Sequence, residues 1–362
     1  MQENADSLLD LGLSHLKANR ALDAVETLEK LRCLAPDHPG LTEAYVKALR
    51  KDARHAQALS VAEAARPQTV QLMFERALSL LALGRAGESL AAFDAVLALD
   101  AHLAVAWYQS HGPALDLIGL DEAQRRIERA LACTGANGNY RALLAAYHLL
   151  ADHASEAKQI ARKARHRVLI EGIEALRPFF APGLRLFGVS AHLLDHALAQ
   201  ADLQGLVLEF GVRRGTSLSL IAQRARQAVH GFDSFEGLPE SWGANPAGVL
   251  TTGAELPQLP SNACLHPGWF NDTLPAFLAS HPDPVRFINI DSDIYASART
   301  VLFALAPRLL PGCIVVFDEL IGNPTWRDDE YKALMEAKAA FSLHFEIFAL
   351  APATKQVALR IL

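Results

Sequence analysis

Apolar residues recur along the first 165 residues with the spacing of amphipathic helices, whereas short β-branched runs begin only later in the chain. Alanine and leucine dominate the first part, and apolar positions return there every three or four residues, as on one face of a helix. Runs such as LVLEFGV at 206–212 follow and are separated by helical stretches. This change of pattern predicts an all-helical region followed by an α/β region.

The helical region repeats. Small residues stand at intervals of 34, 31, 34 and 34 positions, at Ala24, Ala58, Ser89, Ala123 and Ala157. Apolar residues follow each of them four positions later, at Leu28, Ala62, Phe93, Ile127 and Ala161. A small residue in one helix lets its partner helix approach closely, and the larger residue one turn later fills the remaining space. The pattern therefore predicts stacked helix pairs, with a non-repeating alanine-rich bundle as the alternative.

The first unit carries the clearest motif, with Leu8, Gly12, Ala24, Leu28 and Pro36 at its characteristic offsets. The period and these offsets resemble the tetratricopeptide repeat. The resemblance implies a superhelix of four to five helix pairs in residues 1–165. It also implies a surface for a protein partner or for self-association, since such arrays have no chemistry of their own.

The second region alternates strands and helices. Strands are predicted at 206–212, 228–235, 263–270, 285–291 and 313–318, with a closing pair at 344–350 and 356–361. Helices are predicted at 216–227, 273–280, 296–309 and about 329–341. This order predicts a mostly parallel, seven-stranded, Rossmann-like sheet in 206–362. Residues 166–205 are expected to be helices that link the regions and cap the site, and 1–165 is expected to be separable.

Candidate binding residues follow the predicted strands, because doubly wound sheets bind ligands beyond the carboxyl ends of their strands. The first strand leads into EFGVRRGTS at 209–217, a G-x-x-x-G turn rather than the G-x-G-x-x-G of dinucleotide-binding proteins. Asp233 stands 22 positions after Gly211, where nucleoside-binding sheets place an acid for ribose hydroxyls. A simple turn-capping role for Asp233 is the alternative. Trp269, after the third strand, could stack on a flat base or close the core.

Acidic residues end the next two strands, with Asp291 and Asp293 after one and Asp318 and Glu319 after the other. Carboxylates held together raise each other's pKa values unless a cation compensates them. A magnesium site or a proton-transfer role is one interpretation of this group. Helix N-caps, which Asp suits well, are the other.

Five segments together resemble the class I S-adenosylmethionine-dependent methyltransferases, and more narrowly the macrocin O-methyltransferase family. They are EFGVRRGTS at 209–217, FDSFEGLP at 232–239, GWFNDTLP at 268–275, INIDSDIYASARTVLFAL at 288–305 and LLPGCIVVFDEL at 309–320. The resemblance covers about 190–350 and implies an O-methyltransferase with S-adenosylmethionine lying across the strand ends. Its acceptor is expected to be a small-molecule or carrier-bound hydroxyl.

The resemblance also implies roles for single residues. The cofactor-binding set is Glu209, Gly211, Gly215, Thr216, Ser217, Asp233, Ser234, Phe235, Gly268 and Trp269. Magnesium, in the metal-dependent members, would be held by Asp291, Asp293, Asp318 and Glu319, although Glu319 stands where the family often has aspartate. Asp293 is the first candidate for the catalytic base, and His266 is the second.

Composition narrows the function classes. The hydrophobic fraction of 51% excludes global disorder, and 34 basic against 40 acidic residues, a net charge of −6, argue against a general nucleic-acid binder. The sequence contains no apolar run of about 18 residues, so no membrane span is predicted, and no secretory signal is visible. Four distant cysteines without a C-x-x-C pair indicate reduced thiols in a cytoplasmic protein. A scaffold protein with an inactive methyltransferase fold and a nicotinamide-dependent oxidoreductase remain the competing functions.

Overall fold

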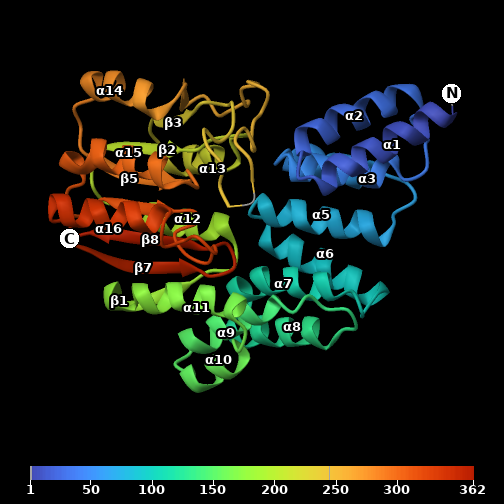
Figure 1. Ribbon diagram of the computed structural model, residues 1–362, viewed down its shortest axis with the longest axis horizontal. Helices are drawn as coiled ribbons and strands as arrows, with labels where there is room; N and C mark the ends of the chain where they lie inside the picture. The colour runs from blue at the N-terminus through green and yellow to red at the C-terminus, as the bar shows by residue number, and fades with distance from the viewer. Residues whose placement is uncertain (1, 244) are drawn as a thin grey trace.

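The computed structural model describes residues 2–243 and 245–362 (Figure 1). Its helical region contains α1 (Gln2–Lys17), α2 (Ala21–Leu34), α3 (Leu41–Lys51), α4 (His55–Ala64), α5 (Val70–Ala82), α6 (Ala86–Leu99), α7 (Ala104–Leu117), α8 (Leu120–Ala132), α9 (Tyr140–Leu150), α10 (Ala154–Ile160) and α11 (Ala164–Leu176). Short turns join these helices into successive pairs that stack side by side.

The repeat pattern explains how these pairs pack. The five small residues at the repeat positions, Ala24, Ala58, Ser89, Ala123 and Ala157, all have an exposed fraction of 0%. In the first pair, a Cβ atom on Gly12 would lie 2.7 Å from Cδ2 of Leu28, so glycine there makes room for the leucine of the facing helix. The prediction of a tetratricopeptide-like array is confirmed.

The α/β region follows. Its strands are β1 (Phe180–Leu186), β2 (Leu206–Phe210), β3 (Val229–Asp233), β4 (Ala263–Pro267), β5 (Val285–Ile290), β6 (Ile314–Phe317), β7 (Phe345–Ala351) and β8 (Gln356–Ile361). Its helices are α12 (Ser190–Ala199), α13 (Thr216–Ala225), α14 (Phe270–Ser280), α15 (Tyr295–Leu305) and α16 (Glu330–Phe341), with 3-10 turns η1 (Arg177–Phe179) and η2 (Ala306–Arg308). The predicted Rossmann-like fold is confirmed.

One eight-stranded sheet has the order β1-β7-β8-β6-β5-β2-β3-β4, and β8 alone runs antiparallel to its neighbours. Successive residues of the central strands point to opposite faces, and both faces are buried. Leu208 and Ile288 pack with α11 and α14–α16, whereas Val207 and Phe287 pack with α12 and α13. The result is three layers whose loops meet at the carboxyl ends of β2, β3, β5 and β6.

Two expectations about the sheet were wrong. Residues 166–205 are not helices alone, because they contain β1, which pairs in parallel with β7 and brings the sheet to eight strands instead of seven. The sequence of β1, FAPGLRL, does not predict a strand, because Pro182 and Gly183 interrupt its apolar pattern. Three of its residues are exposed and none is buried, as in an edge strand without a helix over both faces.

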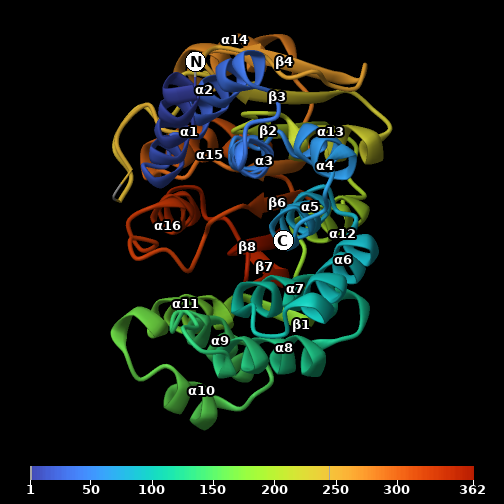
Figure 2. The ribbon, with the colours of Figure 1, turned by 90° about the vertical axis from the view of Figure 1, so that its right-hand side faces the viewer.

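The array packs along one side of the α/β region (Figures 1 and 2). One hydrophobic cluster runs from Leu115 and Ile127 of the array through Ile173 to the strands, so the two regions share a core, and the expected separability of 1–165 stays a prediction. Among the contacts between the two regions are two groups of residues that we call the glycine joint and the ionic joint. The glycine joint consists of Gly112, Asp116, Gly188 and His192. The ionic joint consists of Asp52, Arg54, Arg213, Arg214 and Glu255.

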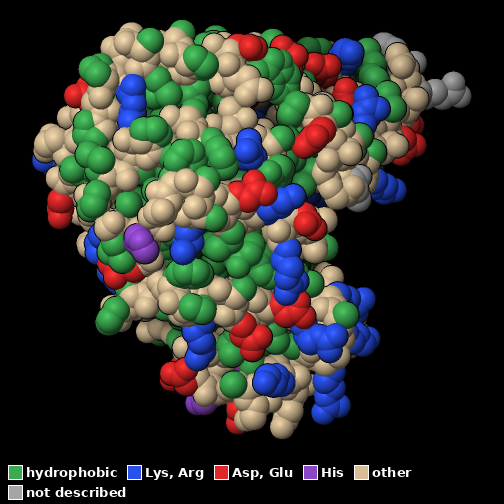
Figure 3. Space-filling view, turned by 60° about the vertical axis from the view of Figure 1, so that its left-hand side comes forward, with side chains coloured by type: hydrophobic (Ala, Val, Ile, Leu, Met, Phe, Trp, Pro, Cys, Tyr) green, Lys and Arg blue, Asp and Glu red, His purple; other side chains and the backbone are tan. Residues whose placement is uncertain are grey.

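The surface carries mixed charge. Positive and negative side chains are both spread over the face shown in Figure 3. Within the described residues, none of the helices is both long and apolar enough to span a bilayer.

Candidate active site

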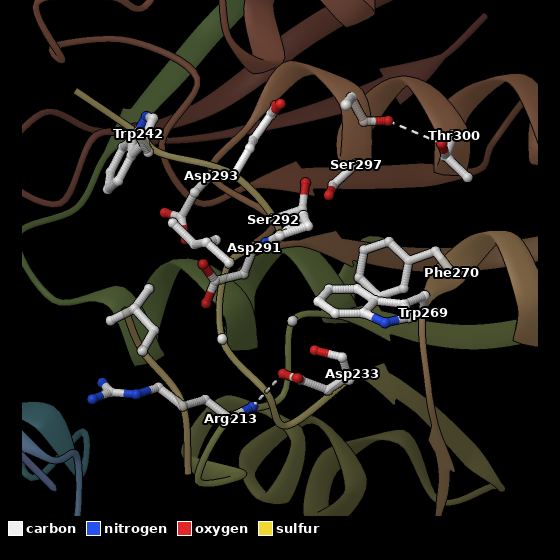
Figure 4. A pocket seen from close by; sticks show the side chains of 18 of the residues that line it. Arg213, Asp233, Trp242, Trp269, Phe270, Asp291, Ser292, Asp293, Ser297 and Thr300 are labelled. Carbon is white, nitrogen blue, oxygen red and sulfur yellow. Dashed lines mark hydrogen bonds between the residues drawn. The ribbon is translucent and has the colours of Figure 1, made fainter. Parts of the chain in front are cut away.

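A cavity of about 730 Å³ opens at the carboxyl ends of β2, β3, β5 and β6 (Figure 4). Its lining includes Gly211, Asp233, Ser234, Trp269, Asp291, Asp293, Asp318 and Glu319, all of which were predicted as site residues from the sequence. Trp269 and Phe270 lie together on one side of this cavity, and Asp291 and Asp293 lie across from them. The chain direction of the parallel strands brings these residues together, because their carboxyl ends share one edge of the sheet.

The glycine turn, residues 211–215, joins β2 to α13. Gly211 has φ +96°, and a Cβ atom there would lie 1.7 Å from the backbone oxygen of Asp291. The end of β2 and the segment after β5 can approach this closely only when residue 211 is glycine. The turn therefore lies directly against the first acid of the cavity.

Asp233, the last residue of β3, holds the glycine turn in place. Its Oδ2 accepts hydrogen bonds from the backbone N–H groups of Val212 and Arg213, both at 2.8 Å, and its Oδ1 accepts one from Phe235 at 2.6 Å. The turn-capping role considered from the sequence is therefore present. Asp233 also lines the cavity, so its carboxylate has room for a further partner.

Glu209 lies one position before the end of β2 and is completely buried. Its Oε1 accepts a hydrogen bond from Nδ2 of Asn289 at 2.8 Å, whereas Oε2 has no hydrogen-bond partner. Burial raises the pKa of Glu209 to about 8. An unpaired, buried carboxylate oxygen behind the glycine turn is costly unless a ligand donates to it.

The acids of the cavity disfavour one another's charged forms. Burial, then the charges of Glu319 and Asp318, raise the pKa of Asp293 to about 7. Burial, then Glu319, raise the pKa of Asp318 to about 6, and burial followed by Asp318 raises the pKa of Asp291 well above its ordinary value. A positively charged ligand at this edge would relieve the repulsion.

Two of the predicted magnesium ligands already have other partners. Glu319 bonds to Nζ of Lys355 at 3.0 Å and to Nδ2 of Asn323 at 2.7 Å, and Asp318 accepts a hydrogen bond from Nε2 of Gln356 at 2.5 Å. Throughout residues 2–243 and 245–362, no three His, Cys, Asp or Glu side chains are grouped to hold a metal ion. These partners leave the four acids unsuited to magnesium as they are arranged, so the magnesium site expected from the sequence is not supported.

Aromatic and hydroxyl side chains complete the cavity. Trp242 comes from the cover loop, residues 236–262, and its Nε1 donates to Oδ2 of Asp329 at 3.4 Å. Ser297 and Thr300 lie on α15, and Thr300 donates to Oδ1 of Asn271 on α14 at 3.2 Å. The cavity thus combines flat apolar surfaces with neutral polar groups.

Several predicted cofactor residues lie outside this cavity. Gly215 and Thr216 border a second cavity of about 530 Å³, between α13 and the α3–α4 turn. A Cβ atom on Gly215 would lie 2.6 Å from Cδ2 of Leu259, so this glycine makes room for the cover loop. Phe235 is buried, Ser217 lies beside Glu209 in the first turn of α13, and Gly268 donates to the backbone oxygen of Asp233.

His266, the second candidate base, does not line the cavity either. Its ring stacks on Phe232 with centroids 4.5 Å apart, and its Nε2 lies 3.1 Å from Nδ1 of His230. Burial, then the nearby His281, lower the pKa of His266. His266, on β4, thus lies in an aromatic cluster with Phe232 and Phe277, and Asp293 is left as the candidate base.

The sequence reasoning missed other lining residues. Arg213 lines the cavity and belongs to the EFGVRRGTS segment, but nothing in that segment distinguishes it from its neighbour Arg214. Asn271, Ser297 and Thr300 also line the cavity and belong to segments of the resemblance. The i, i+3 spacing of Ser297 and Thr300 on α15 indicates that these two share one face of the helix. Glu330 does not line the cavity but is buried beside Ser292, which does. No sequence pattern predicts this contact, because it depends on how α16 packs.

Comparison with known proteins identifies the domain that contains this cavity. Residues 208–320 match the family model described as a methyltransferase domain, which confirms the predicted domain in that segment. A relative from Streptomyces olivaceus, 8-demethyl-8-(2,3-dimethoxy-alpha-L-rhamnosyl)-tetracenomycin-C 4'-O-methyltransferase, is 31% identical over 164 residues, 38% of this chain and 60% of its own. Demethyldecarbamoylnovobiocin O-methyltransferase from Streptomyces niveus is 28% identical, with 36% and 60% covered.

The chain thus spans 60% of the length of these curated relatives. Among solved structures, the apo form of CalS11, a TDP-rhamnose 3'-O-methyltransferase, is 27% identical, with 47% of this chain and 77% of that chain covered and a TM-score of 0.35.

Proposed function

We propose that the protein is an S-adenosylmethionine-dependent O-methyltransferase whose acceptor is a sugar hydroxyl of a small glycoside. The observation that carries the proposal is the cavity at the carboxyl edge, where Gly211, Asp233, Trp269 and Asp293 meet within the segment that matches a methyltransferase domain. The acceptor class is supported by the rhamnosyl substrate in the name of one relative and by the lining of the cavity.

The residues at the edge fit this cofactor. Glu209 offers an unpaired buried carboxylate oxygen behind the glycine turn, and Asp233 offers a carboxylate to ribose hydroxyls. Trp269 presents a flat surface for a base. The crowded acids complement the positive charge of a sulfonium and an ammonium group. When bound, S-adenosylmethionine supplies an electrophilic methyl group.

The acceptor would lie between the aromatic side chains and Asp293. Trp242 and Phe270 suit the apolar face of a sugar ring, and Ser297 and Thr300 suit its hydroxyls. Asp293 takes the proton of the reacting hydroxyl, and its pKa of about 7 is close to the value that serves a general base at neutral pH. No step requires a metal ion. A carrier-bound acceptor is the less direct alternative, since only the fused array supports it.

Calorimetric titration with S-adenosylmethionine tests the proposal most directly. We expect one molecule bound per chain. Absence of binding by the folded protein would favour the competing scaffold function, in which the fold carries no activity. With a panel of deoxysugar glycosides as acceptors, activity should survive chelation of divalent ions. Loss of activity in chelator and its recovery with magnesium would establish the metal requirement instead.

Asp293→Asn tests the proposed base. The change keeps the shape of the side chain but removes its capacity to take a proton, so the rate should fall by roughly 10²–10⁴-fold. Cofactor affinity, measured by the same titration, should change much less. Asp272→Asn, on the first turn of α14 and outside the cavity lining, is the matched control and should keep full activity. Full activity of Asp293→Asn would reject this residue as the base.

A further inference from the structure

A buried carboxylate of the array supports the glycine turn of the α/β region. Asp52, directly after α3 in the second helix pair, has an exposed fraction of 0%. Its Oδ2 accepts hydrogen bonds from Nη2 of Arg214 at 2.7 Å and from Nε of Arg54 at 2.8 Å. Its Oδ1 lies 3.8 Å from Nη2 of Arg213. One acid of the array thus faces two consecutive arginines of the glycine turn.

The cover loop joins the same group of charges. Oε2 of Glu255 lies 2.7 Å from Nη1 of Arg214 and 2.8 Å from Nη2 of Arg54. The side chain of Arg214 is only 8% exposed, so its guanidinium depends on these two carboxylates. Removing one partner of a buried charge leaves the other uncompensated, which is far more costly than losing an exposed ion pair.

The ionic joint is connected to the cavity by two short links. The backbone N–H of Arg213 donates to Asp233, the acid that would hold the ribose, and Arg213 is one of the residues that line the cavity. The side chain of Arg213 donates to the backbone oxygen of Lys51 at 3.4 Å. A shift of the α3–α4 turn would therefore displace Arg213 and, through its backbone N–H, change its hydrogen bond to Asp233.

We propose that Asp52 is a positioning residue for the cofactor site, and that the second helix pair of the array completes this site from outside the α/β region. The inference rests on the function proposed above. Asp52 does not touch the cofactor. It fixes Arg213 and Arg214, which set the path of the glycine turn, and through Arg54 and Glu255 it fixes the end of the cover loop.

The test is titration of the full-length protein with S-adenosylhomocysteine. Asp52→Asn should weaken binding by about tenfold, a typical size for coupling between distinct sites. Asp94→Asn is the matched control. Asp94 pairs with Arg126, whose side chain is 9% exposed. Arg126 also bonds a second carboxylate, Glu122, and so retains one partner in the variant, as Arg214 retains Glu255. The control should bind within about twofold of the wild type, because its ion pair lies within the array and away from the cavity.

Stability is separated from positioning by the form of the binding curve. A purely structural role for Asp52 would lower the melting temperature and the number of competent sites per chain while leaving the dissociation constant unchanged, and that result overturns the proposal. If Asp52→Asn does not fold, Glu255→Gln takes its place, since that side chain is 57% exposed. We expect about threefold weaker binding for it, the lower end of such couplings.

The outcomes also separate this inference from the proposed function. A wild-type protein that binds no S-adenosylhomocysteine overturns both. A wild-type protein that binds, with Asp52→Asn or its substitute binding equally well, overturns only the role of Asp52. Arg214→Gln combined with Asp52→Asn should weaken binding no more than the stronger single change, because both remove the same contact.

Discussion

Two of the contacts between the array and the α/β region, the glycine joint and the ionic joint, have opposite character. In the glycine joint, the backbones of Gly112 and Gly188 touch, and Asp116 accepts a hydrogen bond from the N–H of Gly188 at 2.6 Å. Leu115, the residue before Asp116, belongs to the core shared by both regions. The ionic joint buries charge instead and lies beside the cavity. The first joint is a close backbone contact between the two regions, whereas the second places a buried acid of the array against the glycine turn.

The largest effect is expected from removing the array in steps. The fragment 166–362 loses Leu115, Ile127 and Tyr147 from the shared core and should not unfold cooperatively. The fragment 104–362 retains the glycine joint but loses the ionic joint, so it should fold and bind S-adenosylhomocysteine weakly. Thermal unfolding and calorimetry check both fragments. Cooperative unfolding and wild-type affinity of 166–362 would show that neither joint is required.

A smaller effect is expected from closing the space between the two glycines. A Cβ atom on Gly112 would lie 2.6 Å from the backbone oxygen of Gly188. Gly112→Ala should therefore destabilise the protein by about 1–3 kcal/mol, although alanine favours a helix. The matched control is Gly87→Ala on α6, where a Cβ atom meets nothing within 4 Å. Chemical denaturation should show the control unchanged or slightly stabilised, and equal behaviour of the two variants would contradict the close contact.

The smallest effect concerns pH at the glycine joint. The hydrogen bond from His192 to Asp116, at 2.7 Å, raises the pKa of His192. A histidine whose pKa is raised by folding stabilises the protein fully below its unfolded value of about 6.5, and this stabilisation is lost as the pH rises through the folded pKa. His192→Gln, which keeps a donor, should lower the melting temperature more at pH 6 than at pH 8.5. The loss in the free energy of unfolding should differ between the two pH values by no more than about 1 kcal/mol, because the His192 side chain is 34% exposed. An equal loss at both pH values would mean that the pair carries no charge.

Local patterns predicted much of the fold and part of the site. The burial of Ala24 and the four equivalent small residues followed from a period that each helix pair repeats. Asp233, Asp291 and Asp318 could be placed at one edge because parallel strands end on the same side. Position near a strand end is not enough to place a residue in the cavity. His266 also lies near the end of a strand, but its ring packs against Phe232 in an aromatic cluster.

The sequence by itself determined which residues would be buried at repeat positions and which would follow the strands, because both depend on short-range periodicity and chain direction. Only the tertiary structure decided which distant residues became partners. Asp52 and Arg214 are 162 residues apart, and neither stands in a pattern that points to the other. Their pairing follows from the way the whole array packs against the sheet. Packing of this kind depends on the summed shape of many side chains, and no local spacing in the chain encodes it.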